Sequence, residues 1–270
     1  MKSRVAAYPY ILWMAVFVVM PIVLVVIYAF TDAAGGFTLA NFAKMTDYAV
    51  VFWRSISLAV TATLICLVTG YPVAYLLTRT GEGFQRVSMM LIMLPMWMNF
   101  LLRTYAWMSI LENTGIINRL LSALGLPAAH MINTQGAVVL GMVYNYLPFM
   151  ILPIYSVILK IDKSVIEAAQ DLGADALRVF WRVTLPLSLS GVISGVTMVF
   201  VPSVSTFVIS KLLGGGTNML LGDLIEMQFL GNAYNPNLGA AISLIMMVIV
   251  IICMSIMNRF GEGEEQAVMF

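Results

Sequence analysis

Charge is scarce in this chain: only 10% of its 270 residues are Asp, Glu, Lys or Arg, whereas 61% are hydrophobic. Soluble domains carry roughly a quarter charged residues and about half apolar ones. One globular core cannot hide this excess, so the sequence predicts a protein whose solvent is lipid. The formal net charge of +1 also lacks the basic excess that nucleic-acid binding requires, which excludes a nucleic-acid partner.

Residues that bind metals or form disulfides are nearly absent. The chain has one histidine, His130, and two cysteines, Cys66 and Cys253, which both lie within apolar runs. This set builds neither a zinc site nor a disulfide framework. None of the five lysines follows a glycine, so the Gly-Lys pair of a P-loop is missing and ATP binding by that route is excluded.

Intramembrane catalysis also lacks its residues. A serine protease of that kind needs a histidine within the membrane, but His130 lies in a loop. An aspartyl protease needs two facing carboxylates, and the apolar segments contain no Asp or Glu. We therefore expect no enzymatic activity and no cofactor in this chain.

Six segments are apolar enough to cross a bilayer, whose hydrocarbon core of about 30 Å needs roughly 20 helical residues. The expected spans are residues 8–30, 55–78, 87–108, 135–159, 187–209 and 238–257. The first is too long for the apolar region of a cleavable signal peptide, so we expect an uncleaved helix. Because the loops are too short for a second domain, the sequence predicts one all-α membrane domain over residues 1–270.

The lysines and arginines of the loops are distributed unevenly, and cytoplasmic loops retain positive charge. With both termini in the cytoplasm, four basic residues face outside: Lys44, Arg54, Arg119 and Lys211. Nine then face the cytoplasm, namely Lys2, Arg4, Arg79, Arg86, Lys160, Lys163, Arg178, Arg182 and Arg259. This asymmetry predicts a multi-pass membrane protein with both termini cytoplasmic.

The loop at residues 160–186 has the pattern of two short helices separated by a turn. Ser164 followed by Glu167 forms a capping box and predicts the start of the first helix. Gly173 predicts its end, because glycine takes a left-handed backbone readily. Asp175 is suited to cap the second helix, which we expect to run from Ala176 to about Thr184.

An apolar stripe follows the first of these helices. Val165, Ala169 and Leu172 recur at helical spacing, and Ala168 and Ala169 are small enough to permit close approach. Two interpretations fit this stripe: an amphipathic connector that only joins two spans, or a surface that docks another protein.

The same loop resembles the EAA loop of ABC importer permeases. The resemblance rests on Glu167-Ala168-Ala169, Gly173 and Leu185-Pro186, and extends through Asp171, Ala174, Phe180 and Arg182. It implies a type I ABC importer permease fold with six spans, in a bacterial inner membrane. It also implies that the first helix is a coupling helix that sits in a groove of the ATPase subunit. The coupling residues implied are Ser164, Glu167, Ala168, Ala169, Asp171, Leu172 and Gly173.

Four further segments resemble the first permease subunit of spermidine/putrescine importers: residues 66–75, 94–105, 146–155 and 220–230. This resemblance implies a polyamine substrate. It also implies a second permease, two ATPase copies that bind ATP and Mg, and an extracytoplasmic binding protein. Some polyamine members carry an acidic residue near the outer end of the fifth span, where this chain departs with Lys211. A permease for another small solute and a membrane adaptor for a cytosolic ATPase are the alternatives.

Aromatic residues and one arginine in the spans are candidates for the translocation path. The faces of aromatic rings attract ammonium groups, but aromatic belts at the membrane surface give the same composition. Arg103 lies within an apolar run, where charge is costly, but near enough to its end to reach the membrane surface by snorkelling. The path candidates are Trp97, which is deepest in its span, Tyr105, Trp107 and Phe207.

Two acidic residues are candidates for the solute entrance. Asp223 and Glu226 lie three residues apart in the segment between the fifth and sixth spans, and they share one face if that segment is helical. They have the charge to attract cations. A solvated loop or a contact with the binding protein are the alternative interpretations.

Overall fold

The structure is a computed structural model that describes residues 8–231 and 233–267. The described residues form helices, turns and one isolated bridge between Thr31 and Phe37. The predicted all-α architecture is therefore confirmed over the described part of the chain. Lys2 and Arg4, which contributed to the predicted orientation, lie outside the described residues.

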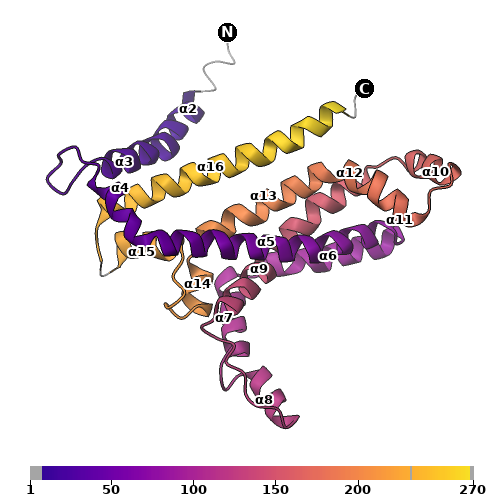
Figure 1. Ribbon diagram of the computed structural model, residues 1–270, viewed down its shortest axis with the longest axis horizontal. Helices are drawn as coiled ribbons and strands as arrows, with labels where there is room; N and C mark the ends of the chain where they lie inside the picture. Colours follow the sequence, from indigo (N-terminus) through magenta and orange to yellow (C-terminus); the bar gives the residue numbers. More distant parts are fainter. Residues whose placement is uncertain (1–7, 232, 268–270) are drawn as a thin grey trace.

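Long helices lie side by side along one direction of the molecule (Figure 1). They are α5 (Ala49–Thr78), α9 (Gln135–Leu159), α13 (Leu189–Ser205) and α16 (Pro236–Ala267). The bounds of α9 are those predicted for the fourth apolar segment. Within the described ranges, four helices are long and apolar enough to cross a membrane, and two bent helix pairs bring the total to at most six.

The first apolar segment contains a π-helical stretch between α2 (Tyr8–Met14) and α3 (Met20–Ala29). The π-helix covers Ala15–Val19 and ends two residues before Pro21. A proline lacks the N–H for its helical bond and crowds the carbonyl one turn earlier, so the preceding turn widens. A second π-helix, Phe180–Thr184, likewise ends two residues before a proline, Pro186.

The third apolar segment, the expected span over residues 87–108, is not one straight helix. The chain turns by 92° between α6 (Glu82–Trp97) and the residues that follow, which form α7 (Phe100–Leu111) and α8 (Ile116–Ala123). The break forms at Asn99, whose side-chain oxygen accepts hydrogen bonds from the N–H groups of Leu101 (2.8 Å) and Leu102 (3.4 Å). Asparagine is a strong helix cap, so a new helix begins there.

The fifth apolar helix, α13, ends at Ser205 and not at the predicted residue 209. Thr206 takes an extended backbone, and α14 (Val208–Leu213) follows as a separate helix. The carbonyls of Ser205 and Thr206 lie against Gly222, where a Cβ atom would come within 2.6 Å of both oxygens. Close backbone contact with α15 (Leu221–Leu230) therefore accompanies the end of α13.

Helices α9 and α13 pack closely through a Gly-x-x-x-Gly pair. A Cβ atom at Gly191 would lie 2.9 Å from the carbonyl oxygen of Pro153, and one at Gly195 would lie 3.1 Å from that of Met150. Small residues at this spacing let helix backbones approach each other within membranes. This contact joins the first turns of α13 to the second half of α9.

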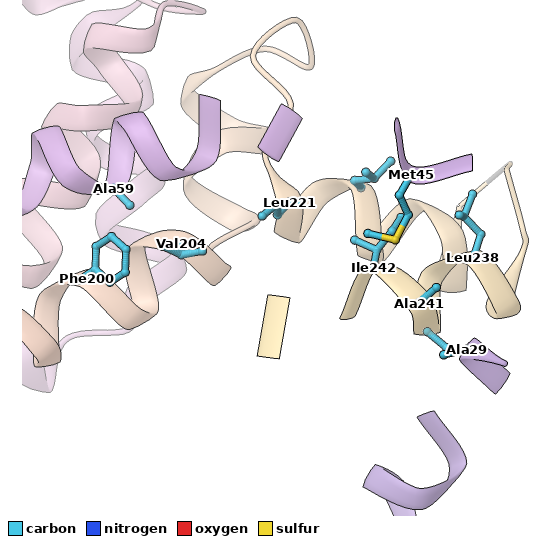
Figure 2. Packing of buried hydrophobic residues seen from close by; sticks show 11 residues of the cluster. Ala29, Met45, Ala59, Phe200, Val204, Leu221, Leu238, Ala241 and Ile242 are labelled. Atoms are coloured by element: carbon cyan, nitrogen blue, oxygen red, sulfur yellow. The ribbon is translucent and has the colours of Figure 1, made fainter. Parts of the chain in front are cut away.

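A hydrophobic core joins the first turns of α5 and α16 to the last turns of α13 (Figure 2). Met45 of the 3-10 turn Met45–Tyr48 reaches it after α4 (Ala40–Lys44), and Leu221 enters it from α15. The other buried members come from α3, α5, α13, α15 and α16, namely Ala29, Ala59, Phe200, Val204, Leu224, Leu238, Ala240, Ala241 and Ile242. In contrast, α2 and the π-helix after it bury no residue in this chain.

Candidate functional site

The segment that resembles the coupling loop forms α10 (Lys163–Asp171) at one end of the long helices, while α15 lies at the other (Figure 1). Within the chain, α10 packs against α11 (Ala176–Val179) and the following π-helix. Two apolar side chains of this segment are uncovered: Val165 is 43% exposed, and Leu172, directly after the last turn, is 90% exposed. An apolar surface this open on a short helix is suited to docking against another protein.

The start of α10 differs from the predicted capping box. Asp162 is the N-cap, and its Oδ1 accepts a hydrogen bond of 2.9 Å from the backbone N–H of Ser164. Because the cap lies two residues earlier than predicted, Ser164 lies inside the first turn and cannot cap it with Glu167. Hydrogen bonds from the backbone N–H and then the side chain of Ser164 lower the pKa of the Asp162 carboxyl.

α10 ends at Asp171, and Gly173 follows the C-cap residue Leu172 as the predicted stop. Gly173 has a φ of +82°, the N–H of Ala174 donates to the carbonyl of Ala169 (3.0 Å), and the N–H of Gly173 donates to that of Gln170 (2.8 Å). These two bonds define a Schellman motif, which needs a left-handed residue at this position. The sharp turn directs the chain from α10 into α11.

The second predicted helix also forms, and it is anchored to the long helices. Asp175 caps α11 by accepting a hydrogen bond of 2.8 Å from the N–H of Arg178. The ring of Phe180 packs edge-on against Tyr71 and Tyr75 of α5, with centroid distances of 5.8 and 5.0 Å. Beyond α12 (Leu185–Leu187), the buried Ser188 lies at a 62° bend before α13. A force on α10 therefore has a packed route into α5 and α13.

At the opposite end, one basic and two acidic side chains gather between α14 and α15. Lys211 Nζ lies 2.8 and 2.9 Å from the two carboxylate oxygens of Glu226, which raises the pKa of the lysine. Asp223 Oδ2 accepts a hydrogen bond of 2.8 Å from the N–H of Leu220 and so caps α15. Burial raises the pKa of the Asp223 carboxyl, while bonds from Ser210 and Leu220 act in the opposite direction.

These three side chains line a cavity of about 290 Å³. Met219, Met227 and Leu230 form its apolar wall, and Gly216 and Gly231 complete it. The predicted helical segment containing Asp223 and Glu226 is thus real and brings both carboxylates to one cavity. No local sequence pattern indicates that Lys211 neutralises Glu226. The arrangement can attract an ammonium group to the carboxylates, in competition with the lysine.

The four aromatic path candidates are dispersed and do not form one cluster. Trp97 is the last residue of α6, next to the 92° bend, and its side chain is 75% exposed. Trp107 is partly buried and packs edge-on against Tyr144 at 5.3 Å. Tyr105 and Phe207 are each less than half exposed. Within the described residues, no ring contact joins any two of these four.

Arg103 is buried, so the prediction that it snorkels to the membrane surface is wrong for this chain. Its side chain lies on α7, which packs against α9 and α14 after the bend, and only 8% of the residue is exposed. Its Nε and Nη1 have no hydrogen-bond partner among the described residues. The Phe100 ring lies 6.0 Å from the guanidinium carbon.

The sequence analysis missed three residues that hold α10 or connect the segment after it to α5. Asp162 is a strong capping residue two positions before Ser164, and this local signal was sufficient to find it. Tyr71 and Ser188 are joined by a hydrogen bond across 117 positions. No local pattern reports a contact of that kind.

The sequence pattern of one protein family, the binding-protein-dependent transport system inner membrane component, matches residues 66–262. The chain belongs to this family. The match covers α9, α10, α13 and α15 in full, the last part of α5 and most of α16. The resemblance to ABC importer permeases and the predicted location in an inner membrane are thereby confirmed, and this inner membrane component is the non-enzymatic part of its transport system.

Curated relatives extend over nearly the whole chain. The spermidine/putrescine transport system permease protein PotB of Haemophilus influenzae is 36% identical over 260 residues, which are 93% of this chain and 91% of that protein. PotB of Escherichia coli K12 is also 36% identical, over 88% of this chain and 90% of that protein. The molybdenum transport system permease ModB of Mycobacterium bovis is 29% identical over 72% of this chain and 73% of that protein.

Solved structures share the fold of this inner membrane component. A bacterial ABC transporter that imports alginate gives a TM-score of 0.84 at 16% identity and covers 97% of this chain and 95% of that one. The methionine ABC transporter MetNI gives a TM-score of 0.60 at 18% identity, over 80% of this chain and 95% of that one. At these identities the likeness carries the fold alone.

The described residues contain no group of three or more His, Cys, Asp or Glu side chains that could hold a metal ion.

Proposed function

We propose that this chain is the permease subunit of an ATP-driven importer of polyamines such as spermidine and putrescine. The observation that carries the substrate class is the 36% identity to PotB of Haemophilus influenzae over nine tenths of both chains. Hydrolysis belongs to a partner ATPase that binds ATP and Mg. This chain supplies half of the translocation pore and the coupling to the ATPase.

In this proposal the chain is one domain with six spans and both termini in the cytoplasm. The two bent helix pairs act as the third and fifth spans, as the length and composition of their helices allow. The nine-to-four distribution of basic residues supports this orientation. In the proposed orientation, α10 lies on the cytoplasmic side of the membrane and α15 lies on the outer side.

We propose α10 as the coupling helix. Its exposed residues Val165, Ala168 and Leu172 enter a groove of the ATPase, and Glu167 and Asp171 meet polar groups at the rim. The turn at Gly173 and the Phe180 anchor then carry the displacement into α5 and α13. Ser164 and Ala169 hold the helix in this position from its first and last turns.

The partners in this proposal are a second permease, two copies of the ATPase and an extracytoplasmic binding protein, all within membrane lipid. The segment from Lys211 to Asn237 receives the binding protein. Asp223 and Glu226 attract the ammonium groups of the solute at the entrance. Trp97, Tyr105, Trp107 and Phe207 offer ring faces along the path, where each contact is worth about 0.5 to 2 kcal/mol. A weak, sequential path suits transport, because tight binding would trap the solute.

Uptake of radiolabelled solutes tests the proposal in a cell that lacks its own polyamine import and carries the full operon. We expect spermidine and putrescine uptake only when this gene is present, and no change in molybdate uptake. Polyamine uptake that does not depend on the gene would reject the polyamine assignment. Restored uptake of another solute would replace the substrate and leave the importer role intact, whereas ATPase recruitment without any uptake would favour an adaptor.

A further inference from the structure

A cavity of about 280 Å³ separates the inner face of α10 from the ends of α5 and α9. Lys163, Ile166, Glu167 and Gln170 line it from α10, and they share one face because they lie three, four and seven residues apart. The outer face of the same helix carries the docking residues Val165 and Leu172. The cavity therefore lies on the side of α10 opposite the apolar residues that enter the ATPase groove.

The wall of this cavity has more positive than negative charge. Arg79 and Lys163 line it together with a single carboxylate, that of Glu167. Neither cation forms an ion pair within the described part of the chain. Arg79 is held in place by Tyr75, which accepts a hydrogen bond of 2.8 Å from Nη2 and has its ring 5.0 Å from the guanidinium carbon.

A buried hydroxyl in the same wall lacks a partner. Thr184, which ends the π-helix, is 1% exposed, and its Oγ1 has no hydrogen-bond partner among the described residues. A buried polar atom left unpaired costs about 1 to 3 kcal/mol, so native structures almost always satisfy such atoms. A polar ligand at this wall accounts for the hydroxyl.

We propose that this cavity binds a phosphate-bearing anion, with Arg79 and Lys163 neutralising its charge and Thr184 donating a hydrogen bond. Arginine matches phosphate oxygens with paired N–H groups, and lysine adds a point charge. The headgroup of an anionic phospholipid and free inorganic phosphate share this chemistry. The bound anion connects α10 to the end of α5, in addition to the packed route through α11 and the π-helix. The consequence for coupling rests on the proposed function, but the binding site does not.

Lipid retention tests the site in the assembled importer. The complex is reconstituted in nanodiscs of phosphatidylcholine with a graded fraction of phosphatidylglycerol, and native mass spectrometry counts the lipids that each complex retains. We expect the double variant Arg79→Gln/Lys163→Gln to retain phosphatidylglycerol about tenfold less well than the wild type. The matched control Arg86→Gln/Lys160→Gln removes two exposed charges outside the cavity and should retain it normally.

Thermal unfolding of the Thr184→Val complex gives a readout independent of charge. Valine has the same shape and removes the unpaired hydroxyl, so unfolding without anion should occur at the wild-type temperature or above it. The increase in unfolding temperature that added anion causes should be smaller in Thr184→Val than in the wild type. Stabilisation by inorganic phosphate in phosphatidylcholine discs identifies a free anion as the ligand, and stabilisation by phosphatidylglycerol alone identifies a lipid.

The proposal would be overturned if the wild-type complex retained phosphatidylglycerol no better than phosphatidylcholine and inorganic phosphate did not raise its unfolding temperature. A second result would also overturn it: the double variant loses the ATPase subunit, while its binding of lipid and phosphate is unchanged. The cavity would then receive a carboxylate of the ATPase and not a phosphate-bearing anion. Neither measurement requires transport. Failure here therefore leaves the importer role standing, and failure of polyamine uptake leaves the anion site standing.

Discussion

The phenol oxygen of Tyr71 lies 2.7 Å from the hydroxyl oxygen of Ser188, and both side chains are buried. Tyr71 belongs to α5, whereas Ser188 lies at the bend between α12 and α13. The hydrogen bond thus joins one long helix to the point where the α10 segment enters another. In the proposed mechanism, this bond is part of the route by which α10 moves the spans.

Replacing Tyr71 by Phe tests that route. The substitution keeps the ring against Phe180 and removes the bond to Ser188, which still donates to the carbonyl of Leu185 at 3.0 Å. We expect a loss of about 0.5 to 1.5 kcal/mol in unfolding free energy. Uptake per ATP hydrolysed should decrease several-fold, as measured in proteoliposomes. Tyr10→Phe, at a ring that is 64% exposed, is the control, and equal effects of the two changes would contradict the route.

The turn at Gly173 should tolerate alanine poorly. A Cβ atom there meets no neighbour within 4 Å, so any effect comes from the φ of +82° alone. A left-handed backbone costs a non-glycine residue about 1 to 2 kcal/mol. Gly173→Ala should lower ATPase recruitment, measured by co-purification, and uptake, while Gly173→Asn should retain most of both because asparagine tolerates this conformation.

Gly83 gives a matched control for that experiment. It also has no neighbour within 4 Å of an added Cβ, but it lies within α6 at an ordinary backbone conformation. Gly83→Ala should be neutral or raise stability by about 0.5 to 1 kcal/mol. Normal recruitment and uptake in Gly173→Ala would remove the turn from the coupling mechanism.

Lys211 competes with the solute in our account of the entrance. Its ammonium binds both oxygens of Glu226. Lys211→Gln frees this carboxylate, so we expect the polyamine concentration at half-maximal uptake to decrease about twofold to fivefold. The pair is exposed, so stability should change little. Lys44→Gln, at another exposed lysine, controls for net charge, and an increase in the half-maximal concentration would contradict the competition.

Asp223 should make stability depend on pH. Burial raises its pKa above the ordinary value of 3.8, so the folded chain binds this proton more tightly than the unfolded chain. The unfolding free energy therefore falls as the pH rises from the ordinary to the raised pKa, and is constant above it. Asp223→Asn keeps an oxygen for the N–H of Leu220 and should flatten this part of the profile in thermal melts from about pH 4 to about pH 7. An unchanged slope would show that another group titrates.

Trp97 and Trp53 separate a path contact from general surface exposure, because both are 75% exposed. If Trp97 lines the path, Trp97→Leu removes a ring that attracts ammonium, a contact worth about 0.5 to 2 kcal/mol. We expect polyamine uptake to decrease about twofold to thirtyfold, the range that this free energy corresponds to. Trp53→Leu should leave uptake unchanged. Equal losses in both variants would assign Trp97 to membrane anchoring.

Much of the helical architecture could be predicted from composition and local signals. The fourth apolar run gave the bounds of α9, and Gly173 and Asp175 predicted the turn and the cap between α10 and α11. These features depend on neighbours within one or two turns of the chain. The cap of α10 was misassigned because two capping residues, Asp162 and Ser164, lie two positions apart and only the first is used.

Features that depend on distant contacts could not be predicted. The bend at Asn99 interrupts a run whose hydropathy is continuous, and it turns α7 onto α9 and α14, where Arg103 becomes buried. The pairing of Lys211 with Glu226 likewise follows from how α14 and α15 meet. A linear sequence reports charge and periodicity, but it does not report which side chains the fold brings together.

ATP-driven uptake of radiolabelled spermidine into proteoliposomes tests the central claim most directly. The liposomes contain the complete importer, with the binding protein outside and ATP enclosed at the α10 side. We expect spermidine to accumulate only with ATP, and Gly173→Ala to reduce accumulation while the basal hydrolysis of the retained ATPase continues. Accumulation of spermidine without ATP would contradict coupling through α10. Undiminished accumulation in a Gly173→Ala variant whose α10 is displaced would contradict it as well.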